Sequence, residues 1–564
     1  MIMRKYILYA LCFVAIALCA VGCYDDEGNY DYHEVNMVDV VIPQTSVRMP
    51  KDKAVEVSIV PKISQTLEQM EDNLAFQWRR LKENAEIGSD RFSDYEDYSV
   101  GKECKITIEP EQTTGVGLML IVSNKKDGTT WYQFGKVSII KPFNPCWFVL
   151  QEKDEKGVLG VIEGNPEAYS ISSDVFKMET GGSFPLEGKP LAVAARRQYG
   201  DSYYSTMPFR FDIYMYPALM LVTNQALSLF TPSTLQPKYE SNKILFEPYQ
   251  QGKVPNIEYY KMTRSGELIV NDGKAYFSYM DGYCLPFTVK MDDELPSLSA
   301  YGSYGQGMLF FDMENHRFLY GSTYSIMDYM KYRSNKSKEV RDGTTPWSDD
   351  VRPKELYTFD KSSDNAFDPD NIDPSLQIKD MVTGGNYGYY TYAIAARQGE
   401  KALTVFKFNS DEEPECAAKY ENIQLPAEVD LVNAKFAASH AYAANIIFMT
   451  SGNKLYRVNL DRALVTELYA YSADPSAQIS CLKFKDSESV GDEDEDDEEM
   501  VKYKDSQGMC LGLGINTGDK GVVVEIQLTI AGDVSRAANG ICVYESPDQP
   551  IGKIVDITYN YELE

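Results

Sequence analysis

The residue types that carry most enzyme chemistry are either sparse in this chain or lack a diagnostic spacing. Its three histidines, His33, His316 and His440, include no pair at zinc-binding spacing. Acids number 84, and a glycosidase needs two carboxyls about 5–10 Å apart, but no spacing singles out such a pair. The sequence has no GxSxG nucleophile motif and no phosphate-binding loop. We therefore predict a protein that is not an enzyme and that uses no metal or cofactor.

Aromatic side chains outside the predicted strands are the main candidates for ligand binding. An aromatic ring offers an apolar face and, in Tyr and Trp, a polar edge, so it suits sugar rings and peptide side chains. Trp347 has the strongest case, because it stands among polar turn residues in GTTPWSDD. The tyrosines of GGNYGYYTY alternate, so packing against a sheet is an equally good interpretation for them. The candidates are Trp347, Tyr199, Tyr203, Tyr204, Tyr387, Tyr389 and Tyr390.

An acidic run from Asp492 to Glu499 (DEDEDDEE) is the sharpest local feature of the chain. Consecutive like charges repel one another, which predicts an extended and exposed loop. Carboxylate oxygens suit Ca²⁺ and other hard cations, but the run lacks the glycine and the spaced bidentate Glu of an EF-hand loop. We favour weak, non-specific association of cations over a defined metal site.

Cys23 ends an N-terminal apolar segment. Residues 1–22 begin with basic residues, and the uncharged run that follows is too short to span a bilayer comfortably, which is typical of a secretory signal. The small residues before Cys23 match a bacterial lipobox, in which the cysteine becomes the lipidated first residue of the mature chain. An ordinary signal peptide with a chance cysteine is the alternative. Residues 23–36 are polar and acidic, which indicates a flexible tether.

The composition excludes one class of partner and favours one class of fold. The formal net charge is −29 over 564 residues, and binding to phosphate backbones needs a basic face, so no nucleic-acid partner is expected. The 41 Tyr and 24 Phe residues favour strands. Beyond Cys23 the seven remaining cysteines include no CxxC pair. We interpret them as buried thiols rather than a disulfide framework.

Residues 37–141 are predicted to form a small β-sandwich of the Ig/PKD-like type. Trp78 lies in an alternating strand, where Ig-like folds often bury a core tryptophan. Asn124 to Gly128 (NKKDG) is typical of a hairpin connection. The strand-like runs are 37–43, 54–64, 74–81, 104–110, 117–124 and 129–140.

Residues 142–564 contain a loose repeat of an apolar strand, a short turn and an alternating strand. The turns contain Asp-Gly, Gly-Asn, Thr-Gly or Asn, as two-strand hairpins require. Seven hairpins predict a β-propeller-like domain of about seven blades, with an insertion near 322–391, so the whole chain is expected to be all-β. Two further β-sandwiches are the alternative. The hairpins cover 147–164, 218–235, 266–280, 307–321, 392–408, 445–460 and 512–528.

The start of the expected mature chain, CYDDEGNYDYHEVN, and the strand that contains LAFQWRR together resemble the PKD-like family of Bacteroidetes lipoproteins. PKD denotes the polycystic-kidney-disease type of Ig-like domain. The stretch WFVLQEKDEKGVLGVIEG is also similar to the later region of that family. The acidic residues directly after Cys23 resemble the signal that sends such lipoproteins to the outer face of the outer membrane.

This resemblance implies an accessory role in nutrient uptake. Such proteins are generally encoded beside a TonB-dependent transporter of the starch-utilisation type and its lid lipoprotein. We expect a lipid-anchored protein at the cell surface that captures an oligosaccharide or peptide, or docks on that transporter, and the family supplies no catalytic motif. Two rivals remain: a surface polysaccharide-processing enzyme (glycosidase or lyase) on a propeller scaffold, and a subunit that only stabilises a transporter assembly.

Overall fold

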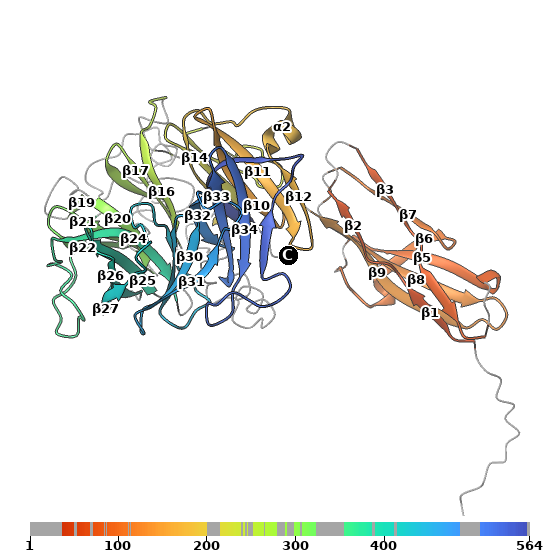
Figure 1. Cartoon of the computed structure of the whole chain (residues 1–564). Coiled ribbons are helices and arrows are strands. Elements are labelled where there is room, and N and C mark those ends of the chain that lie inside the picture. Colours follow the sequence, from red (N-terminus) through yellow and green to blue (C-terminus); the bar gives the residue numbers. More distant parts are fainter. Residues whose placement is uncertain are drawn as a thin grey trace, which may run out of the picture. The chain divides into compact units, whose positions relative to one another are not determined.

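The contacts divide the chain into two compact units, Met1–Lys141 and Pro142–Glu564, which are drawn in the computed structural model of Figure 1. Each unit is described by itself. The structure describes residues 36–49, 53–67, 71–83, 85, 87–110, 112, 114–140, 142–199, 215–238, 241–242, 245, 252–263, 266–278, 288–289, 298–304, 307–322, 355–385, 390–410, 414–485 and 508–560.

The first unit is a β-sandwich. A five-stranded sheet in the order β2-β9-β8-β5-β6 carries one layer, and the pairs β1–β4 and β3–β7 form the rest. Two short 3-10 turns, η1 (Glu71–Asn73) and η2 (Phe92–Asp94), precede β5 and β6. The strands are β1 (Val38–Val41), β2 (Thr45–Arg48), β3 (Val55–Ile59), β4 (Lys62–Gln65), β5 (Leu74–Leu81), β6 (Tyr95–Val100), β7 (Cys104–Ile108), β8 (Val116–Asn124) and β9 (Thr130–Ile140).

Strand alternation builds the sandwich core. Trp78, at the centre of β5, is fully buried and packs with apolar residues of β7 and β8. Its indole Nε1 donates to the carbonyl of Gly101 at 3.1 Å, so the ring is buried without losing its hydrogen bond. The predicted sandwich with a core Trp78 is therefore confirmed. The sequence missed β2 and β6, in which only Tyr95 is buried, so that neither strand carries a clear apolar periodicity.

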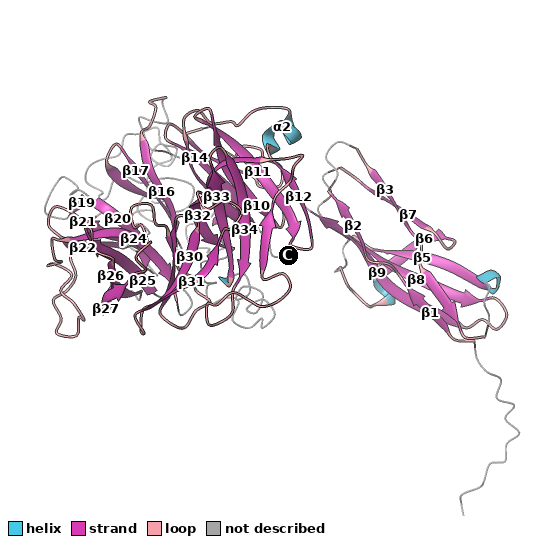
Figure 2. Cartoon of the chain, viewed as in Figure 1, coloured by secondary structure: helices cyan, strands magenta, loops and turns pink. Residues whose placement is uncertain are grey.

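The second unit is built mainly from antiparallel groups of three or four strands, two of which join into one eight-stranded sheet, and it also contains one short parallel pair. Figure 2 shows these strands in magenta and the short helix α2 (Val175–Thr180) in cyan. The first half comprises β10 (Cys146–Lys153), β11 (Lys156–Asn165), β12 (Ala168–Ser172), β13 (Pro190–Tyr199), β14 (Met215–Thr223), β15 (Leu227–Phe230), β16 (Ile257–Thr263), β17 (Gly266–Asn271), β18 (Lys274–Ser278), β19 (Thr288–Val289), β20 (Leu298–Tyr304), β21 (Gly307–Asp312), β22 (Arg317–Ser322) and β23 (Glu355–Leu356).

The second half continues the same pattern and ends on a long strand. It comprises β24 (Leu376–Gly384), β25 (Tyr390–Arg397), β26 (Ala402–Ser410), β27 (Pro414–Gln424), β28 (Phe436–Ala437), β29 (Ile446–Ser451), β30 (Lys454–Asn459), β31 (Leu464–Ala470), β32 (Gln478–Phe484), β33 (Cys510–Thr517), β34 (Lys520–Gln527), β35 (Ile541–Tyr544) and β36 (Ile551–Asn560).

All seven predicted hairpins are present in the described part of the chain. They are the pairs β10–β11, β14–β15, β17–β18, β21–β22, β25–β26, β29–β30 and β33–β34. Each hairpin has a further strand on its inner side, and these inner strands contact one another in the order β32, β36, β13, β16 and, further along, β20, β24, β28, β32. This arrangement confirms the predicted all-β, propeller-like fold.

The last strand of the chain closes the unit onto its first hairpin. β36 pairs antiparallel with β10, from Cys146 opposite Asn560 to Glu152 opposite Lys553. β36 also meets β34 at Gly552 and Ile551. The group β12-β11-β10-β36 thus combines the two ends of the second unit, which removes two free sheet edges.

The two ends of these strand groups differ. At the turn end the hairpins close through short turns, and the chain passes to the next group beside them. Ile257 N, at the start of β16, donates to Asn224 O in the β14–β15 turn at 2.9 Å. Ile479 N, in β32, donates to Gly452 O in the β29–β30 turn, also at 2.9 Å. At the opposite end, the loop end, each inner strand except β36 connects to the next strand of its group, and Asn560 of β36 lies opposite Cys146 there.

Candidate functional site

Three groups are joined directly at the loop end. Gly385, after β24, donates its N–H to the carbonyl of Ser439 at 2.7 Å. The hydroxyl of Ser439, which follows β28, donates to the carbonyl of Gly508, before β33, at 2.6 Å. Ser439 is almost fully buried. These two bonds fix the β24–β25, β28–β29 and β32–β33 connections to one another where they start or end.

Two glycines allow this close approach. Gly385 has a φ of 68°, and a Cβ there would lie 2.8 Å from Tyr390 Cδ2. A Cβ on Gly508 would lie 2.7 Å from Cε1 of His440, so the buried His440 ring packs directly under the junction. A side chain at either glycine would have to displace its neighbour.

Tyr390 is the sequence-predicted binding residue whose side chain the structure describes. It opens β25 and packs, half-buried, against the core between the β24–β27 and β28–β31 groups. The ammonium of Lys407, on β26, lies 3.3 Å from the centroid of its ring, a cation–π contact. Burial lowers the pKa of Lys407. One face of Tyr390 is therefore covered by a protein cation.

A chain of hydrogen bonds extends from this core to the surface. The buried Tyr392 hydroxyl donates to Asn445 Oδ1 at 3.1 Å, and Asn445 Nδ2 donates to Asp461 Oδ1 at 2.9 Å. Tyr420 also donates to Asp461 Oδ1, at 3.2 Å. Burial and the charge of Asp461 raise the pKa of Tyr420 to about 12. With these phenols protonated at neutral pH, this group offers hydrogen bonds to a ligand rather than a nucleophile.

The other sequence-predicted binding residues are placed only by their flanking strands. Tyr199 ends β13 opposite Met215 of β14, at the loop end. At the same end, Gly384 of β24 pairs with Tyr390 of β25, and Phe484 of β32 pairs with Leu511 of β33. β22 also ends at the loop end, and Tyr357 returns antiparallel to Tyr320. Cys23, Tyr203, Tyr204, Trp347, Tyr387, Tyr389 and the run from Asp492 to Glu499 lie outside the described residues.

His316 and its acidic neighbours lie at the turn end instead. Asp312 is fully buried and accepts hydrogen bonds from the backbone N–H groups of Glu314 and Asn315. It also pairs with Arg317 Nε at 3.0 Å. Each of these contacts stabilises the β21–β22 turn, so Asp312 has a structural partner for its carboxylate.

Sequence reasoning missed a buried ionic cluster that joins the first strand of the second unit to its last strands. Glu525 Oε2, on β34, accepts from Trp147 Nε1 at 2.9 Å and from the Tyr544 hydroxyl at 3.0 Å. Lys485 Nζ lies 3.1 Å from the same oxygen and 4.4 Å from the ring centroid of Tyr559. Burial, together with the charge of Glu525, raises the pKa of Tyr544. The available signal was a single Glu inside the apolar run VVVEIQL.

The described cysteines are free thiols, and four of them, Cys104, Cys146, Cys416 and Cys481, belong to apolar clusters. Burial raises the pKa of the Cys416 and Cys481 thiols to about 12 in each case. Such thiols stay protonated at neutral pH and are poor nucleophiles. The described thiols are Cys104, Cys146, Cys416, Cys481, Cys510 and Cys542, of which Cys542 is half-buried. Among the described residues, no three His, Cys, Asp or Glu side chains gather closely enough to hold a metal ion.

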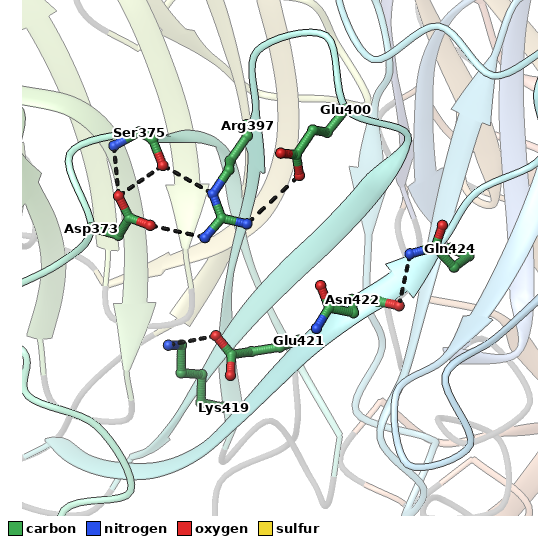
Figure 3. A network of polar contacts seen from close by, with 8 residues as sticks. All are labelled: Asp373, Ser375, Arg397, Glu400, Lys419, Glu421, Asn422 and Gln424. Carbon is green, nitrogen blue, oxygen red and sulfur yellow. Dashed lines mark hydrogen bonds and ion pairs between the residues drawn. The ribbon is translucent and has the colours of Figure 1, made fainter.

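An exposed polar network lies at the turn end of the β24–β27 group (Figure 3). Arg397 donates to Asp373 Oδ2 at 2.8 Å and to the Ser375 hydroxyl at 2.9 Å, and it also pairs with Glu400. Arg397 and Ser375 hold the pKa of Asp373 well below its usual range. Because Arg397 already pairs with both carboxylates, its charge is engaged within the protein, and the network stabilises the turn.

Comparison with known proteins identifies one family match. Residues 23–190 match the model of the PKD-like family, which covers the first unit and the first hairpin of the second. No curated protein matches the sequence. In the described residues, no helix is both long and apolar enough to cross a membrane.

Solved structures resemble the chain distantly. A quinonprotein alcohol dehydrogenase-like protein from Bacteroides thetaiotaomicron is 12% identical, with 92% of this chain and 97% of that chain covered and a TM-score of 0.36. AztD from Citrobacter koseri is 10% identical over 86% of this chain and 98% of that chain, with a TM-score of 0.32. A DUF4784 family protein from Bacteroides caccae is 9% identical, with 78% of this chain and 97% of that chain covered and a TM-score of 0.31. The fold assignment rests on the strand pairing described above.

Proposed function

We propose that this chain is a lipoprotein of the outer membrane, exposed at the cell surface and anchored through Cys23. Its propeller-like unit captures an oligosaccharide or peptide nutrient at the loop end, or docks there on a TonB-dependent transporter, and it catalyses no reaction. The signal pattern before Cys23 and the PKD-like match over residues 23–190 support this role.

One observation carries the proposal: the segments that contain the sequence-predicted binding residues join strands at a single end. Tyr199 and Gly384 are the last residues of inner strands at the loop end, and Ser322, which ends the strand before the Trp347 segment, lies opposite Gly307 at the same end. Propellers and other loop-bearing scaffolds commonly place binding residues on connections held by a rigid sheet. The hydrogen bonds of Ser439 supply such rigidity, because they tie three connections together.

The chemistry of the described side chains favours binding over catalysis. Tyr420, Asn445 and Asp461 form a hydrogen-bonded group near the surface, which suits hydroxyl-rich ligands. The nearby Lys407 is engaged with the Tyr390 ring. A glycosidase or lyase would instead need a pair of acids or an activated base that faces a substrate.

Surface location is tested on intact cells of the source bacterium. Proteinase K added outside the cells should degrade the wild-type protein, and [³H]palmitate should label it. Cys23→Ala should abolish the label and release the chain from the membrane fraction, whereas Cys104→Ala, at a buried thiol, should retain the label. Protection of the wild-type protein from external protease would contradict surface exposure.

The uptake role is tested by affinity purification of the intact lipoprotein from native membranes. Recovery of a TonB-dependent transporter with its lid lipoprotein would support it. Purified protein is then incubated with oligosaccharides and peptides, and the products are followed by mass spectrometry. Bound but unchanged ligand is expected, and cleaved glycan would replace the capture role by the glycosidase or lyase alternative.

A further inference from the structure

A cross-strand row of four side chains, exposed at its two ends and half-buried at Gln77 and Ile121, lies on the outer face of the five-stranded sheet in the first unit. Gln77 of β5 is registered between Val100 of β6 and Ile121 of β8, and Ile121 is opposite Tyr132 of β9. Val100 is 81% exposed and Tyr132 is 56% exposed. Because side chains alternate along a strand, the neighbouring Trp78 points to the opposite face, into the core.

An aromatic pair ends this row. Phe92 of η2 is 43% exposed and meets the Tyr132 ring edge-to-face, with centroids 5.0 Å apart at 84°. Arg79 holds η2 in place, because its Nη1 donates to Phe92 O at 3.3 Å and its Nε donates to Asp97 Oδ1 at 3.0 Å. The Tyr132 ring is therefore held by its neighbours and still presents accessible surface.

The row borders a small second core, against which Ile121 packs. Leu81, Tyr95 and Met119 are buried on the same outer face, beneath the β5–β6 connection. That connection is fixed by a hydrogen bond from the Tyr95 hydroxyl to Ser89 O at 2.7 Å. Packing therefore accounts for the buried three but leaves Tyr132 and Val100 without an apolar neighbour on their exposed sides.

Polar groups flank the row on both sides. On one side the hydroxyls of Ser123 and Thr130, which are opposite each other in β8 and β9, lie 3.4 Å apart. On the other side Arg79 is neutralised by Asp97. Strands are about 4.8 Å apart, so a row that crosses four strands is about 14 Å long. The surface is thus an apolar strip with hydrogen-bonding edges.

The charge of this strip selects the chemical class of its partner. Val100, Gln77, Ile121 and Tyr132 are uncharged, and the chain as a whole carries −29, so polyanions are repelled by the protein and gain no cation from the strip. A neutral, hydroxyl-rich chain needs no counter-charge: its apolar sugar faces stack on rings, and its hydroxyls bond to amide and hydroxyl groups.

We infer that the row Val100–Gln77–Ile121–Tyr132 binds a neutral oligosaccharide. A sugar ring stacks on Tyr132, and the hydroxyls of the glycan bond to Gln77 and to Ser123 and Thr130. This inference rests on the proposed capture role and makes the sandwich a second binding unit of the chain, with neutral glycans as its ligand class.

Affinity electrophoresis of the full mature chain tests the inference. Native gels contain amylopectin, glucomannan or dextran, and a parallel gel contains the polyanion polygalacturonate. We expect at least one neutral polysaccharide to retard the wild-type protein. Tyr132→Ala and Gln77→Ala should each raise the apparent dissociation constant, obtained from the retardation, at least tenfold. Tyr132→Phe should retain most of the binding.

Tyr98→Ala is the matched control. Tyr98 is an exposed tyrosine of the same unit, but its hydroxyl donates to Lys105 O on β7, in the other sheet. It should bind like the wild type. Unchanged binding by Tyr132→Ala would overturn the inference while leaving the capture role intact. Failure of every neutral polysaccharide to retard the wild type would also overturn it, and recovery of a protein partner on this face would indicate a docking surface instead.

Discussion

Glu525 shows how one carboxylate can connect strands from both ends of a unit. Its Oε2 receives the indole of Trp147 on β10, the phenol of Tyr544 on β35 and the ammonium of Lys485 after β32. The side chains of Lys485 and Glu525 are 10% and 7% exposed. A buried ion pair contributes little over apolar residues, but removal of one partner leaves the other charge uncompensated.

We predict that Glu525→Gln destabilises the second unit by about 3–5 kcal/mol, because Lys485 stays buried without its counter-charge. Urea unfolding followed by circular dichroism measures the change. Glu467→Gln is the control, since the Lys454–Glu467 pair is largely solvated and its loss should cost less than about 1 kcal/mol. Equal destabilisation by the two variants would contradict a special role for the buried cluster.

Asp373 gives a prediction about pH. Hydrogen bonds from Arg397 and Ser375 depress its folded-state pKa, so the stabilisation is present above the pKa of the unfolded chain and is lost as pH falls through the folded value. We expect the Asp373 carboxylate to remain ionised at pH 3, where a free Asp, with a pKa of about 3.9, is mostly protonated.

The measurement is ¹³C NMR of selectively labelled aspartate, with Asp373→Asn to assign the signal. Arg397→Gln should raise the midpoint toward the ordinary value. A midpoint for Asp373 that is unaffected by Arg397→Gln would show that the network of Figure 3 does not control its ionisation.

The sequence alone predicted the environment of some of these residues but not of others. Trp78 was predictable because an aromatic residue in an alternating strand faces a core. Glu525 was not, because its three partners are brought to it by strands up to 378 positions away in the sequence. Tyr390 was predicted as a ligand contact, and its Lys407 neighbour depends on strand register that a single sequence does not specify.

Among the elements, the inner strand β36 has the most connections. Its Asp556 accepts from Val193 N on β13 at 3.0 Å and from Lys483 Nζ on β32 at 2.7 Å. Two residues on, Thr558 accepts from Ala195 N at 3.1 Å, so β13 runs parallel to β36. A single strand thereby ties three consecutive groups together through side-chain bonds.

Asp556→Ala should destabilise the second unit by about 2–3 kcal/mol, because it leaves the buried N–H of Val193 without its acceptor and the Lys483 ammonium without its carboxylate partner. Hydrogen exchange read by mass spectrometry should show faster exchange in β13 and β36, and β29 should be unchanged. Asp548→Ala, at an exposed position, is the control. Uniform acceleration across all strands would indicate global rather than local loosening.

Hairpin strands were predictable and inner strands were not, for a physical reason. β29 is buried at every residue and reaches its partner through a Gly-Asn turn, so its apolar run and turn chemistry are both visible in the sequence. The inner strand β24 mixes buried, half-buried and exposed positions and has a bulge between Ile378 and Asp380. A bulge breaks the period of two on which recognition of a strand depends.

For the whole molecule, the division into two units leads to a prediction about folding. The first unit has its own apolar core around Trp78, and its length is within the usual range of autonomous domains. A fragment of residues 36–141 should fold alone and melt cooperatively. With Trp131→Phe as the background, the fluorescence should change from that of a buried Trp78 to that of an exposed one. Ile106→Ala in the buried core should lower its stability by about 2–5 kcal/mol, whereas Val100→Ala should not.

The full chain should then show two unfolding transitions by calorimetry, one of which matches that of the fragment. A fragment that binds hydrophobic dye and lacks a cooperative transition would show that the first unit depends on the rest of the chain.

The closure of the second unit by β36 also sets a condition on biosynthesis. The side chain of Asn560 bonds to the carbonyl of Phe143, 417 positions earlier, and β10, which pairs with β11 on one side, gains its second partner only after β36 has been synthesised. Until then the fully buried strand CWFVLQ has an unpaired edge, and long-range pairing of this kind is slow. In a nascent or translocating chain, this edge of β10 therefore stays exposed and prone to aggregation until the ten residues of β36 are available.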